Sequence, residues 1–306
     1  TRKPSEMTDE DYKKFYNELY PYTFEEPLFH IHLNVDYPFN LTGILYFPKV
    51  RDRFEVQKNK IQLYCNQVFV TDQVEGVVPD FLTLLHGVID SPDIPLNVSR
   101  SYLQSDPNVK KISSHISKKV ADKLEEMFKT DRAAFEAKWD DVKVFVEYGM
   151  ITDTKFYERA EKFSLFKDTH SKYYTLNEYK ELVKDTQTNK EKELVYLYTS
   201  NLVEQDTYIS AAVNRGYNVL IFDGVLDSHF INTLEQKFEK TKFTRVDADV
   251  IDKLIQKEEN TNSGLTDEQK EQLKPLFEEV VDKTSYQIQF ENMSSGDQPV
   301  LITQSE

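Results

Sequence analysis

Apolar and polar residues in the first fifty positions follow a helical pattern and then a strand pattern. Thr8 and Asp11 have the spacing of a capping box, and apolar residues recur after them at helical spacing until Pro21. FHIHLNV (29–35) alternates apolar and polar residues as a half-buried strand does, and LTGILYFP (41–48) predicts a neighbouring strand. The sequence therefore predicts that a short helix precedes a pair of strands.

The next hundred residues predict a strand and then mainly helices. KIQLYCNQVFV (60–70) predicts a third strand, and Pro79 predicts the start of a short apolar helix that runs to Val88. Asp106 and Pro107 are well suited to open another helix, as its N-cap and its first helical residue. This helix would carry one apolar stripe, made of Val109, Ile112, Ile116, Val120, Leu124 and Met127.

The second half of the chain predicts alternating strands and helices. ELVYLYT (193–199) and NVLIFDG (218–224) have the composition of buried strands, and KFTRVDAD (242–249) predicts a third. The segments 205–216 and 229–240 predict the connecting helices, the first of which ends at a glycine. Strands that alternate with helices indicate a small βαβαβ unit with a parallel sheet.

A polar linker, KEENTNSGLTDEQK (257–270), separates this unit from the last residues. Beyond it the pattern predicts one helix, from Asp267 to about Asp282, and two further strands. These elements are too few for a domain, and the chain begins with Thr1. We therefore expect a segment cut from a longer protein at both ends.

Composition narrows the class of protein. The chain has 306 residues and a formal charge of −15, which disfavours a general binder of nucleic acid or of membrane surfaces. A single cysteine excludes a disulfide framework and a thiolate metal cluster. No apolar run approaches the ~20 residues of a membrane helix, and the polar start does not resemble a signal peptide. We expect a cytoplasmic protein.

The usual catalytic motifs are absent, and several candidate groups have plainer interpretations. The sequence holds no phosphate-binding loop, no metalloprotease motif and no nucleophile elbow. His30 and His32 lie on one face of a strand, but no third metal ligand follows at convincing spacing. We therefore predict no metal site. Cys65 is read as an inert thiol, and Asp223 as a turn or cap residue.

One segment stands out by its charge. Residues 97–123 carry six basic against two acidic side chains, a net charge of +4 in a chain of net charge −15. The basic residues flank a loop that leads into a helix N-terminus, where free backbone N–H groups also attract anions. Arg100 offers a planar fork suited to phosphate oxygens, and Gln104 could add a neutral donor. The alternative is a solvated helix face with a salt-bridged arginine.

Four stretches of the sequence resemble the heat-shock-protein-90 family of chaperones, most closely its bacterial branch. The run VIDSPDIPLNVSR (88–100), continued by SYLQ (101–104), is similar to a signature loop of that family. TRKPSEMTDEDYKKFY (1–16), EEPL (25–28) and LYCNQVFVTD (63–72) agree with it as well. The first resembles the opening of the family's middle domain, and the last fifty residues resemble the start of its C-terminal dimerisation domain.

The resemblance implies a fold and a division into domains. It implies an α/β (α+β sandwich) fold with a larger αβα middle subdomain, a helical connector and a smaller αβα subdomain whose sheet is largely parallel. The expected ranges are 1–125 for the larger subdomain, 126–165 for the connector, 166–252 for the smaller subdomain, and 253–306 for a linker and the truncated start of the dimerisation domain.

The resemblance also implies an ATP-dependent mechanism shared between domains. In the family, ATP and Mg are held by an N-terminal domain, which we take to be missing here, and the middle domain completes the site. Arg100 matches the arginine that reaches the γ-phosphate, and Gln104 and Asn97 match neighbours in the same loop. Arg100, Gln104 and Asn97 are therefore the expected catalytic residues, and the fragment alone is not expected to hydrolyse ATP.

The expected partners also follow from the resemblance: the protein's own N-terminal ATPase domain, unfolded or partly folded clients, and a second copy in a homodimer. Candidate client contacts are Phe24, Phe69, Phe230 and Asn232. Phe24 stands where some relatives carry Trp. His229, beside Phe230, stands where the bacterial branch carries Trp, which sets this helix apart from its relatives.

Two other functions remain open on the sequence. A stand-alone α/β enzyme that binds a phosphate ligand could use the small βαβαβ unit, and it would bind nucleotide by itself. A transducer domain of another ATP-clamp protein would place a lysine on the γ-phosphate and present a basic surface to DNA. The charge of −15 and the NVSR loop both disfavour the second alternative.

Overall fold

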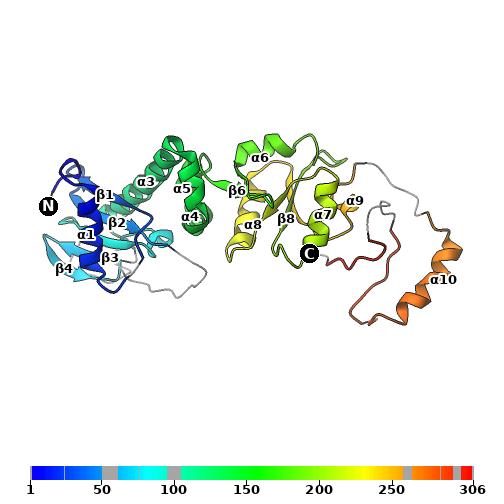
Figure 1. Cartoon of the computed structure of the whole chain (residues 1–306). Helices are drawn as coiled ribbons and strands as arrows, with labels where there is room; N and C mark the ends of the chain where they lie inside the picture. Colours follow the sequence, from blue (N-terminus) through cyan, green and yellow to red (C-terminus); the bar gives the residue numbers. More distant parts are fainter. Residues whose placement is uncertain are drawn as a thin grey trace. The chain divides into compact units, whose positions relative to one another are not determined.

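The computed structural model divides into two compact units, Thr1–Leu165 (unit 1) and Phe166–Glu306 (unit 2) (Figure 1). The expected subdomain ranges are finer than this division and stay predictions. The residues that the structure describes are 2–23, 25–49, 61–74, 76–94, 105–257, 264–282, 284–291 and 298–304.

Unit 1 begins with the predicted helix. A 3-10 turn, η1 (Pro4–Glu6), precedes α1 (Asp9–Leu19). Thr8 is the N-cap of α1: its Oγ1 accepts the backbone N–H of Asp11 at 3.3 Å, and its own N–H donates to the Asp11 carboxylate at 2.9 Å. The capping box read from the sequence is confirmed. It satisfies two backbone donors that would otherwise lack a partner.

The sheet of unit 1 has five strands in the order β1-β2-β5-β3-β4. Its members are β1 (Phe29–Val35), β2 (Leu41–Phe47), β3 (Ile61–Cys65), β4 (Val68–Thr71) and β5 (His86–Asp90). All neighbours pair antiparallel except β3 and β5, which are parallel. The predicted pairing of the first two strands is confirmed in register, from Phe29 opposite Phe47 to Val35 opposite Leu41.

Two predictions for this sheet were wrong. The segment 60–70 is not one strand, because Asn66 and Gln67 take positive φ angles of 52° and 66° and turn the chain between β3 and β4. The helix expected from Pro79 stops after a single 3-10 turn, η2 (Asp80–Leu82), and Val88 lies in β5. There, pairing with β2 and β3 outweighs the weak helical pattern.

Helices cover both faces of this sheet. Adjacent residues of β2 point to opposite sides: Tyr46 packs with Tyr16 of α1, and the Phe47 ring meets that of Phe145 at 5.3 Å between centroids. Phe145 belongs to α4 (Arg132–Thr152). Figure 1 shows α1 on one side of the strands and the longer helices beyond them. Unit 1 is therefore an αβα arrangement.

Three helices complete unit 1. They are α3 (Pro107–Thr130), α4 and α5 (Thr154–Ala160), each with an aspartate N-cap. The predicted stripe of α3 is buried from Val109 to Leu124, while Met127 is partly exposed.

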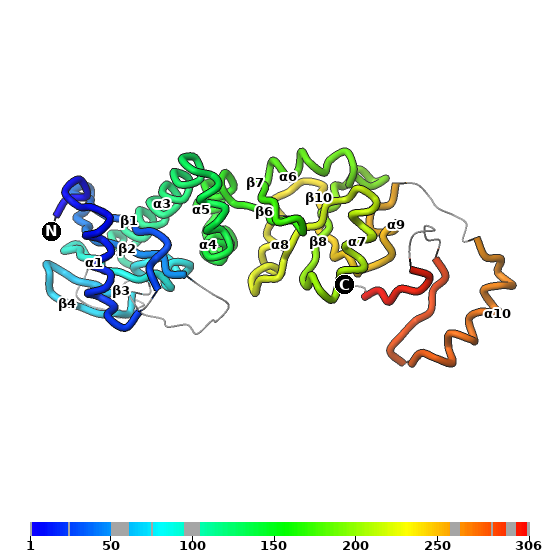
Figure 2. The backbone as a smooth tube through the Cα atoms, in the orientation of Figure 1, coloured from blue at the N-terminus to red at the C-terminus, as the bar shows by residue number. Residues whose placement is uncertain are grey.

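Unit 2 contains the predicted parallel sheet. Its order is β10-β8-β9, with β8 (Leu194–Thr199) between β9 (Val219–Ile221) and β10 (Thr241–Arg245), and both pairings are parallel. The connecting helices are α7 (Asp206–Asn214) and α8 (Asp227–Lys237), which Figures 1 and 2 show around the strands. The predicted βαβαβ unit is confirmed.

The two faces of this sheet carry different side chains. Val195 and Leu197 of β8 pack with Ile209 of α7, whereas Tyr196 contacts Phe238 beside α8. Gly216, with a φ of 78°, ends the segment that holds α7, as predicted. A small hairpin, β6 (Leu165–Lys167) with β7 (Tyr173–Thr175), and α6 (Leu176–Val183) lead into the sheet.

The last residues form few regular elements. They are α9 (Ile251–Leu254) and α10 (Asp267–Glu278), the second of which confirms the predicted last helix. The two strands expected after it are absent from the described segments 284–291 and 298–304, where the chain pairs with no strand. Among the described helices, none has both the length and the hydropathy to cross a membrane.

Candidate functional site

The predicted phosphate-contacting loop joins β5 to α3. Asn97, Arg100 and Gln104 fall within 95–104, outside the described residues. The structure describes the two ends from which this loop extends. These ends fix the positions from which the loop starts and to which it returns.

The leading end of the loop is hydrogen-bonded to β3 and to Asn40, the residue before β2. Ser91 is fully buried; its backbone N–H donates to the Tyr64 carbonyl at 3.1 Å and its hydroxyl donates to the Asn40 carbonyl at 2.6 Å. The Asp93 carboxylate accepts the Asn40 N–H at 2.6 Å. Ile94, 3% exposed, anchors the end in the core. The loop therefore leaves a rigid support.

The trailing end of the loop is the N-terminus of α3. The Asp106 side chain accepts the backbone N–H groups of Asn108 at 2.8 Å and of Val109 at 3.1 Å, and Pro107 occupies the first turn. Val109 is fully buried and holds the first turn in the core. The predicted helix start is confirmed. Both ends of the loop are thus fixed by hydrogen bonds and burial, as a positioned loop requires.

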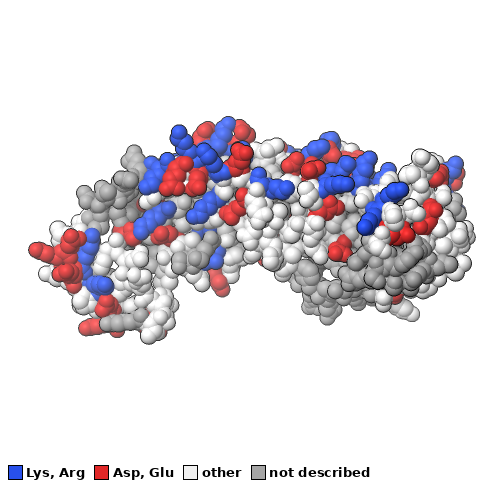
Figure 3. Space-filling view, turned by 180° about the vertical axis from the view of Figure 1, so that it is seen from behind, with Lys and Arg blue, Asp and Glu red and all other residues white. Residues whose placement is uncertain are grey.

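The exposed side of α3 is positively charged next to the loop. Lys110, Lys111, Lys118 and Lys119 are exposed and make no ion pair with any described residue. Burial, together with Lys119 and Lys118, lowers the pKa of His115 on the same helix. Figure 3 shows that Lys and Arg side chains are interspersed with Asp and Glu on the face that it draws. The exposed lysines of α3 attract anions within about 10 Å at moderate salt.

The candidate client contacts do not form one surface. Phe69 is 54% exposed on β4, one of the two edge strands of the five-stranded sheet, next to the exposed Val68. Asn232 is exposed on α8 of unit 2. Phe24 lies outside the described residues. Phe230 is 1% exposed, because its side of α8 packs into the core, so its ring is not available to a client in this structure.

Sequence reasoning missed other exposed apolar side chains. Val203 is 85% exposed and Val225 is 68% exposed, both in loops of unit 2. Each has an acidic residue within two positions, Glu204 and Asp223, and lies outside any periodic pattern. Each valine stands next to a leucine, Leu202 or Leu226, and this short apolar pair among polar loop residues is the only sequence signal for them.

The two strand histidines contact α1, and Asp223 lies on the surface. The His30 ring stacks on Tyr12, and His32 shares a hydrogen bond with the Tyr12 hydroxyl at 2.8 Å. Asp223 is exposed between β9 and α8, just before the turn at residues 225 and 226, and the N-cap position of α8 is Leu226. No group of three or more metal-ligating side chains occurs among the described residues. Cys65 is a free, half-buried thiol.

Comparison with known proteins identifies the family to which this sequence is similar. Residues 1–306 match the model of a family described as Hsp90 protein. Chaperone protein HtpG of Bacteroides thetaiotaomicron is 61% identical over 309 residues, which cover 100% of this chain and 45% of the relative. The HtpG of Porphyromonas gingivalis is 59% identical with the same coverage. The chain therefore spans about half the length of these curated relatives.

A solved structure supports the fold independently. The middle domain of a heat shock protein from Plasmodium falciparum superimposes with a TM-score of 0.62 at 20% identity, covering 80% of this chain and 97% of the other. At this identity the likeness shows the fold. A family match over the whole length, joined to this fold, leads to one conclusion: the chain belongs to the Hsp90 family.

Proposed function

We propose that the chain is the middle region of an ATP-dependent molecular chaperone that acts in the cytoplasm. The observation that carries the proposal is the match of all 306 residues to the Hsp90 family, with relatives that are named chaperones. In the full-length protein, ATP with Mg would bind to an N-terminal domain. The region described here would couple that site to client proteins.

The central residue of the proposal is Arg100. A guanidinium offers paired N–H donors that suit phosphate oxygens, and a charge supplied by a second domain stabilises the transition state of phosphoryl transfer. We assign Arg100 to the γ-phosphate, and Asn97 and Gln104 to supporting contacts in the same loop. The fixed ends at Ser91 and Asp106 support this assignment, because they would limit the entropy lost when the loop engages its partner.

The charge of α3 fits the same role. Lys110 and Lys111 lie in the first turn of α3 beside the loop, and they would favour approach of an anionic nucleotide or of the domain that holds it. The chain by itself would not hydrolyse ATP, since the arginine acts on a nucleotide bound elsewhere. Titration of the 306-residue chain with ATP separates this proposal from a stand-alone phosphate-binding enzyme, which requires saturable binding by the chain alone.

Client binding is the second part of the proposal. Val68 and Phe69 offer an exposed apolar surface on the edge strand β4, and Asn232 offers a polar contact on unit 2. Exposed apolar surface of this kind suits partly folded chains, which expose apolar side chains of their own. Residues 253–306 would begin the domain through which the full-length protein forms a homodimer.

The experiment is suppression of aggregation of a heat-denatured client by the full-length protein, with and without ATP. We expect suppression that ATP modulates, and a loss of at least about threefold in potency for Phe69→Asp. Tyr37→Ser, which alters a side chain 89% exposed elsewhere in unit 1, is the matched control and should leave potency unchanged. A full-length protein that fails to suppress aggregation under any condition contradicts the proposal.

A further inference from the structure

A short hairpin loop of unit 1 contacts both ends of the segment that carries Arg100. Residues 36–40 join β1 to β2, and the paired residues Val35 and Leu41 close the hairpin at its base. Residues 95–104 follow the end of β5 and lead into α3. We call residues 36–40 the bridging loop, because its contacts reach the end of β5 and α3 alike.

The first contact of the bridging loop is with the residues after β5. Both main-chain groups of Asn40 take part: its N–H donates to the Asp93 carboxylate at 2.6 Å, and its carbonyl accepts the Ser91 hydroxyl at 2.6 Å. The Ser91 hydroxyl also accepts the Asp93 N–H at 3.3 Å. The residue Asn40 is exposed, so this contact depends on its backbone and not on its side chain.

These hydrogen bonds continue the pairing of β2 with β5 beyond its last residues. Thr42 lies opposite Asp90 at the end of the ladder, and Asn40 then bonds to Ser91 and Asp93. Ser91 is fully buried, which shields its hydrogen bond from water. A carboxylate acceptor makes a stronger hydrogen bond than a neutral one. The end of β5 is therefore held to the bridging loop by one buried and one charge-assisted hydrogen bond.

The second contact of the bridging loop is with α3. The Phe39 ring meets the His115 ring edge to face, at 5.6 Å between centroids and an interplanar angle of 82°. Phe39 is 7% exposed, and His115 is next in the sequence to Ile116, which is fully buried on α3. Perpendicular ring pairs at this distance are a favoured aromatic arrangement. The residue before Asn40 is therefore packed on the helix that follows residues 95–104.

The surroundings of His115 favour packing of a neutral ring. Burial lowers the pKa of His115, and Lys119 and Lys118 lower it further. Its Nε2 atom is buried and makes no hydrogen bond with any described residue. The contact with Phe39 is therefore made by an uncharged ring that is partly withdrawn from water.

Adjacent residues of the bridging loop thus connect the two ends. Asn40 bonds to the residues after β5 and Phe39 packs on α3, and the peptide bond between them is planar and stiff. Each end also has its own anchor, which is Ile94 in the core for the first and the Asp106 N-cap for the second. The bridging loop adds a direct link between the two anchored ends.

We propose that the bridging loop holds the end of β5 and the start of α3 at the spacing that Arg100 needs, and that Asp93, Ser91 and Phe39 are positioning residues for ATP hydrolysis. The inference rests on the proposed function and adds to it residues that act through Arg100 without touching the nucleotide. The placement of such a group matters, because a shift of about 1 Å can cost about a hundredfold in rate.

The test compares ATP turnover by full-length variants with that of the wild type. Asp93→Ala removes the acceptor of the Asn40 N–H, and we expect it to lower kcat at least about threefold while nucleotide Kd stays unchanged. Asp93→Asn keeps an oxygen that can accept this hydrogen bond, so its kcat should lie within about twofold of the wild type. Asp36→Ala, which removes an exposed acidic side chain from the same loop, is the matched control and should not change turnover.

A double variant shows whether Asp93 acts through Arg100. Arg100→Ala/Asp93→Ala should hydrolyse ATP as fast as Arg100→Ala alone, because the side chain that Asp93 positions is already absent. A residue with a separate effect on turnover would instead multiply the two losses. Multiplied losses, or wild-type turnover by Asp93→Ala, overturn the inference.

Hydrogen exchange of the 306-residue chain tests the link without ATP. Phe39→Leu removes the ring that contacts His115 and keeps an apolar side chain, so we expect this variant to fold, which thermal unfolding checks. Phe39→Leu and Asp93→Ala should each lower the protection of amides in the first two turns of α3, whereas Asp36→Ala should not. Unchanged protection of α3 in both variants would show that the bridging loop does not connect the two ends.

Arg100→Ala separates this inference from the proposed function. If Arg100→Ala lowers turnover and Asp93→Ala does not, the proposed function stands and the bridging loop does not position the arginine. If the wild type does not hydrolyse ATP, or if Arg100→Ala is as active as the wild type, the proposed role of Arg100 fails, and this inference fails with it.

Discussion

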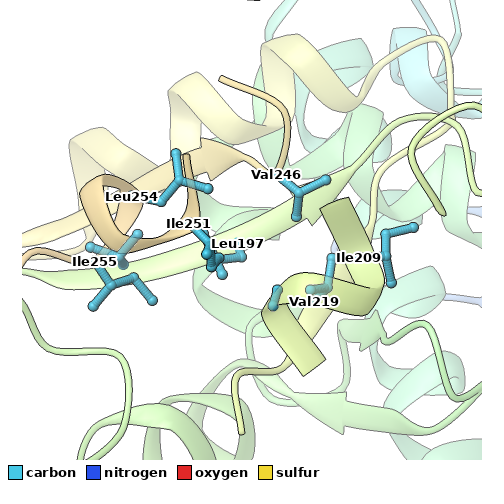
Figure 4. Close-up of a cluster of buried hydrophobic side chains, with 9 residues drawn as sticks. Leu197, Ile209, Val219, Val246, Ile251, Leu254 and Ile255 are labelled. Carbon is cyan, nitrogen blue, oxygen red and sulfur yellow. The ribbon is translucent and has the colours of Figure 1, made fainter. Parts of the chain in front are cut away.

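The contact of α1 with its sheet in unit 1 and the contact of α7 and α9 with theirs in unit 2 are chemically different. In unit 1, α1 meets the sheet through hydrogen-bonded rings: Tyr12 with His32 at 2.8 Å, Tyr16 with His86 at 2.9 Å, and the Tyr20 hydroxyl as acceptor of the Gly87 N–H at 2.7 Å. In unit 2, α7 and α9 pack on the sheet through an aliphatic cluster (Figure 4). The contact of α1 depends on hydrogen bonds, which need a fixed geometry, whereas the contact of α7 and α9 depends on apolar burial, which does not.

The difference has consequences for protonation. Burial raises the pKa of Tyr16 to about 12, so its hydroxyl stays protonated at physiological pH. Burial also lowers the pKa of His30 and of His32, so neutral imidazoles are favoured in the folded unit. The α1 contact therefore depends on pH. The aliphatic cluster of unit 2 contains no titratable side chain among its buried members, so its packing does not change with pH.

The largest expected effect is a break of the unit 1 sheet at Gly87. A Cβ atom there would lie 2.0 Å from the Ile44 carbonyl oxygen, at a φ of +137°. The backbone of β2 cannot give way without losing its pairing with β5. We expect Gly87→Ala to destabilise unit 1 by at least about 3 kcal/mol, measured by chemical denaturation.

The control for this variant is Gly216→Ala in unit 2. Gly216 also has a positive φ, +78°, but no atom lies within 4 Å of an added Cβ. Only the left-handed backbone conformation is disfavoured, at about 1 to 2 kcal/mol. Equal losses for the two variants would show that the close approach of β2 and β5 is not what requires glycine at position 87.

Removal of aliphatic volume from unit 2 is the next test. Leu197 is fully buried in the cluster that joins β8, α7 and α9. Leu197→Ala should cost about 2 to 5 kcal/mol, with the same loss at pH 6 and pH 8. Hydrogen exchange followed by mass spectrometry would assign the loss to unit 2, and a loss that grows at low pH would contradict the comparison.

A smaller effect is expected from the polar contact of unit 1. Tyr12→Phe removes the hydroxyl that bonds His32 and keeps the ring that stacks on His30. We expect a loss of about 1 kcal/mol, read from the midpoint of urea unfolding. Phe15→Leu, at a partly buried position of the same helix, preserves these polar contacts and serves as the control. If Tyr12→Phe is as stable as the wild type, the hydrogen bond adds nothing to docking.

The smallest effect is the pH dependence itself. The ordinary pKa of His30 and His32 is 6.5, and burial lowers it in the folded unit. Below about pH 6.5 the unfolded chain therefore binds more protons than the folded one, and stability falls as pH falls. Between pH 7 and pH 5.5, the protection of α1 amides against hydrogen exchange, relative to their intrinsic exchange rates, should fall more than that of α7 amides. An equal fall in protection in both helices contradicts the assignment to these histidines.

Much of the fold could be predicted from local patterns. The capping box at Thr8, the α3 start at Asp106 and the parallel sheet of unit 2 each have strong local signals, and the structure contains them. The turn at Asn66 and Gln67 was missed because it has no glycine, although both residues take positive φ. The strand β5 was missed because its pairing partners, β2 and β3, are distant in sequence.

The candidate site was less predictable, because exposure depends on packing across the whole unit. Phe69 lies in a predicted strand and Phe230 in a predicted helix, and both were candidate client contacts, yet one is 54% exposed and the other 1%. The loop with Arg100 was found only through its charge and its resemblance to a family signature. Its ends are described, whereas Arg100 itself lies outside the described residues.

The measurement that tests the account most directly is steady-state ATP turnover by the full-length protein, wild type against Arg100→Ala, with nucleotide affinity measured alongside. Lys180→Ala, which removes an exposed positive charge from α6, is the control. We expect Arg100→Ala to lower kcat at least about tenfold, or ~1.4 kcal/mol of transition-state stabilisation, while nucleotide Kd and the control stay unchanged. Turnover by Arg100→Ala equal to that of the wild type would contradict the role assigned to this loop.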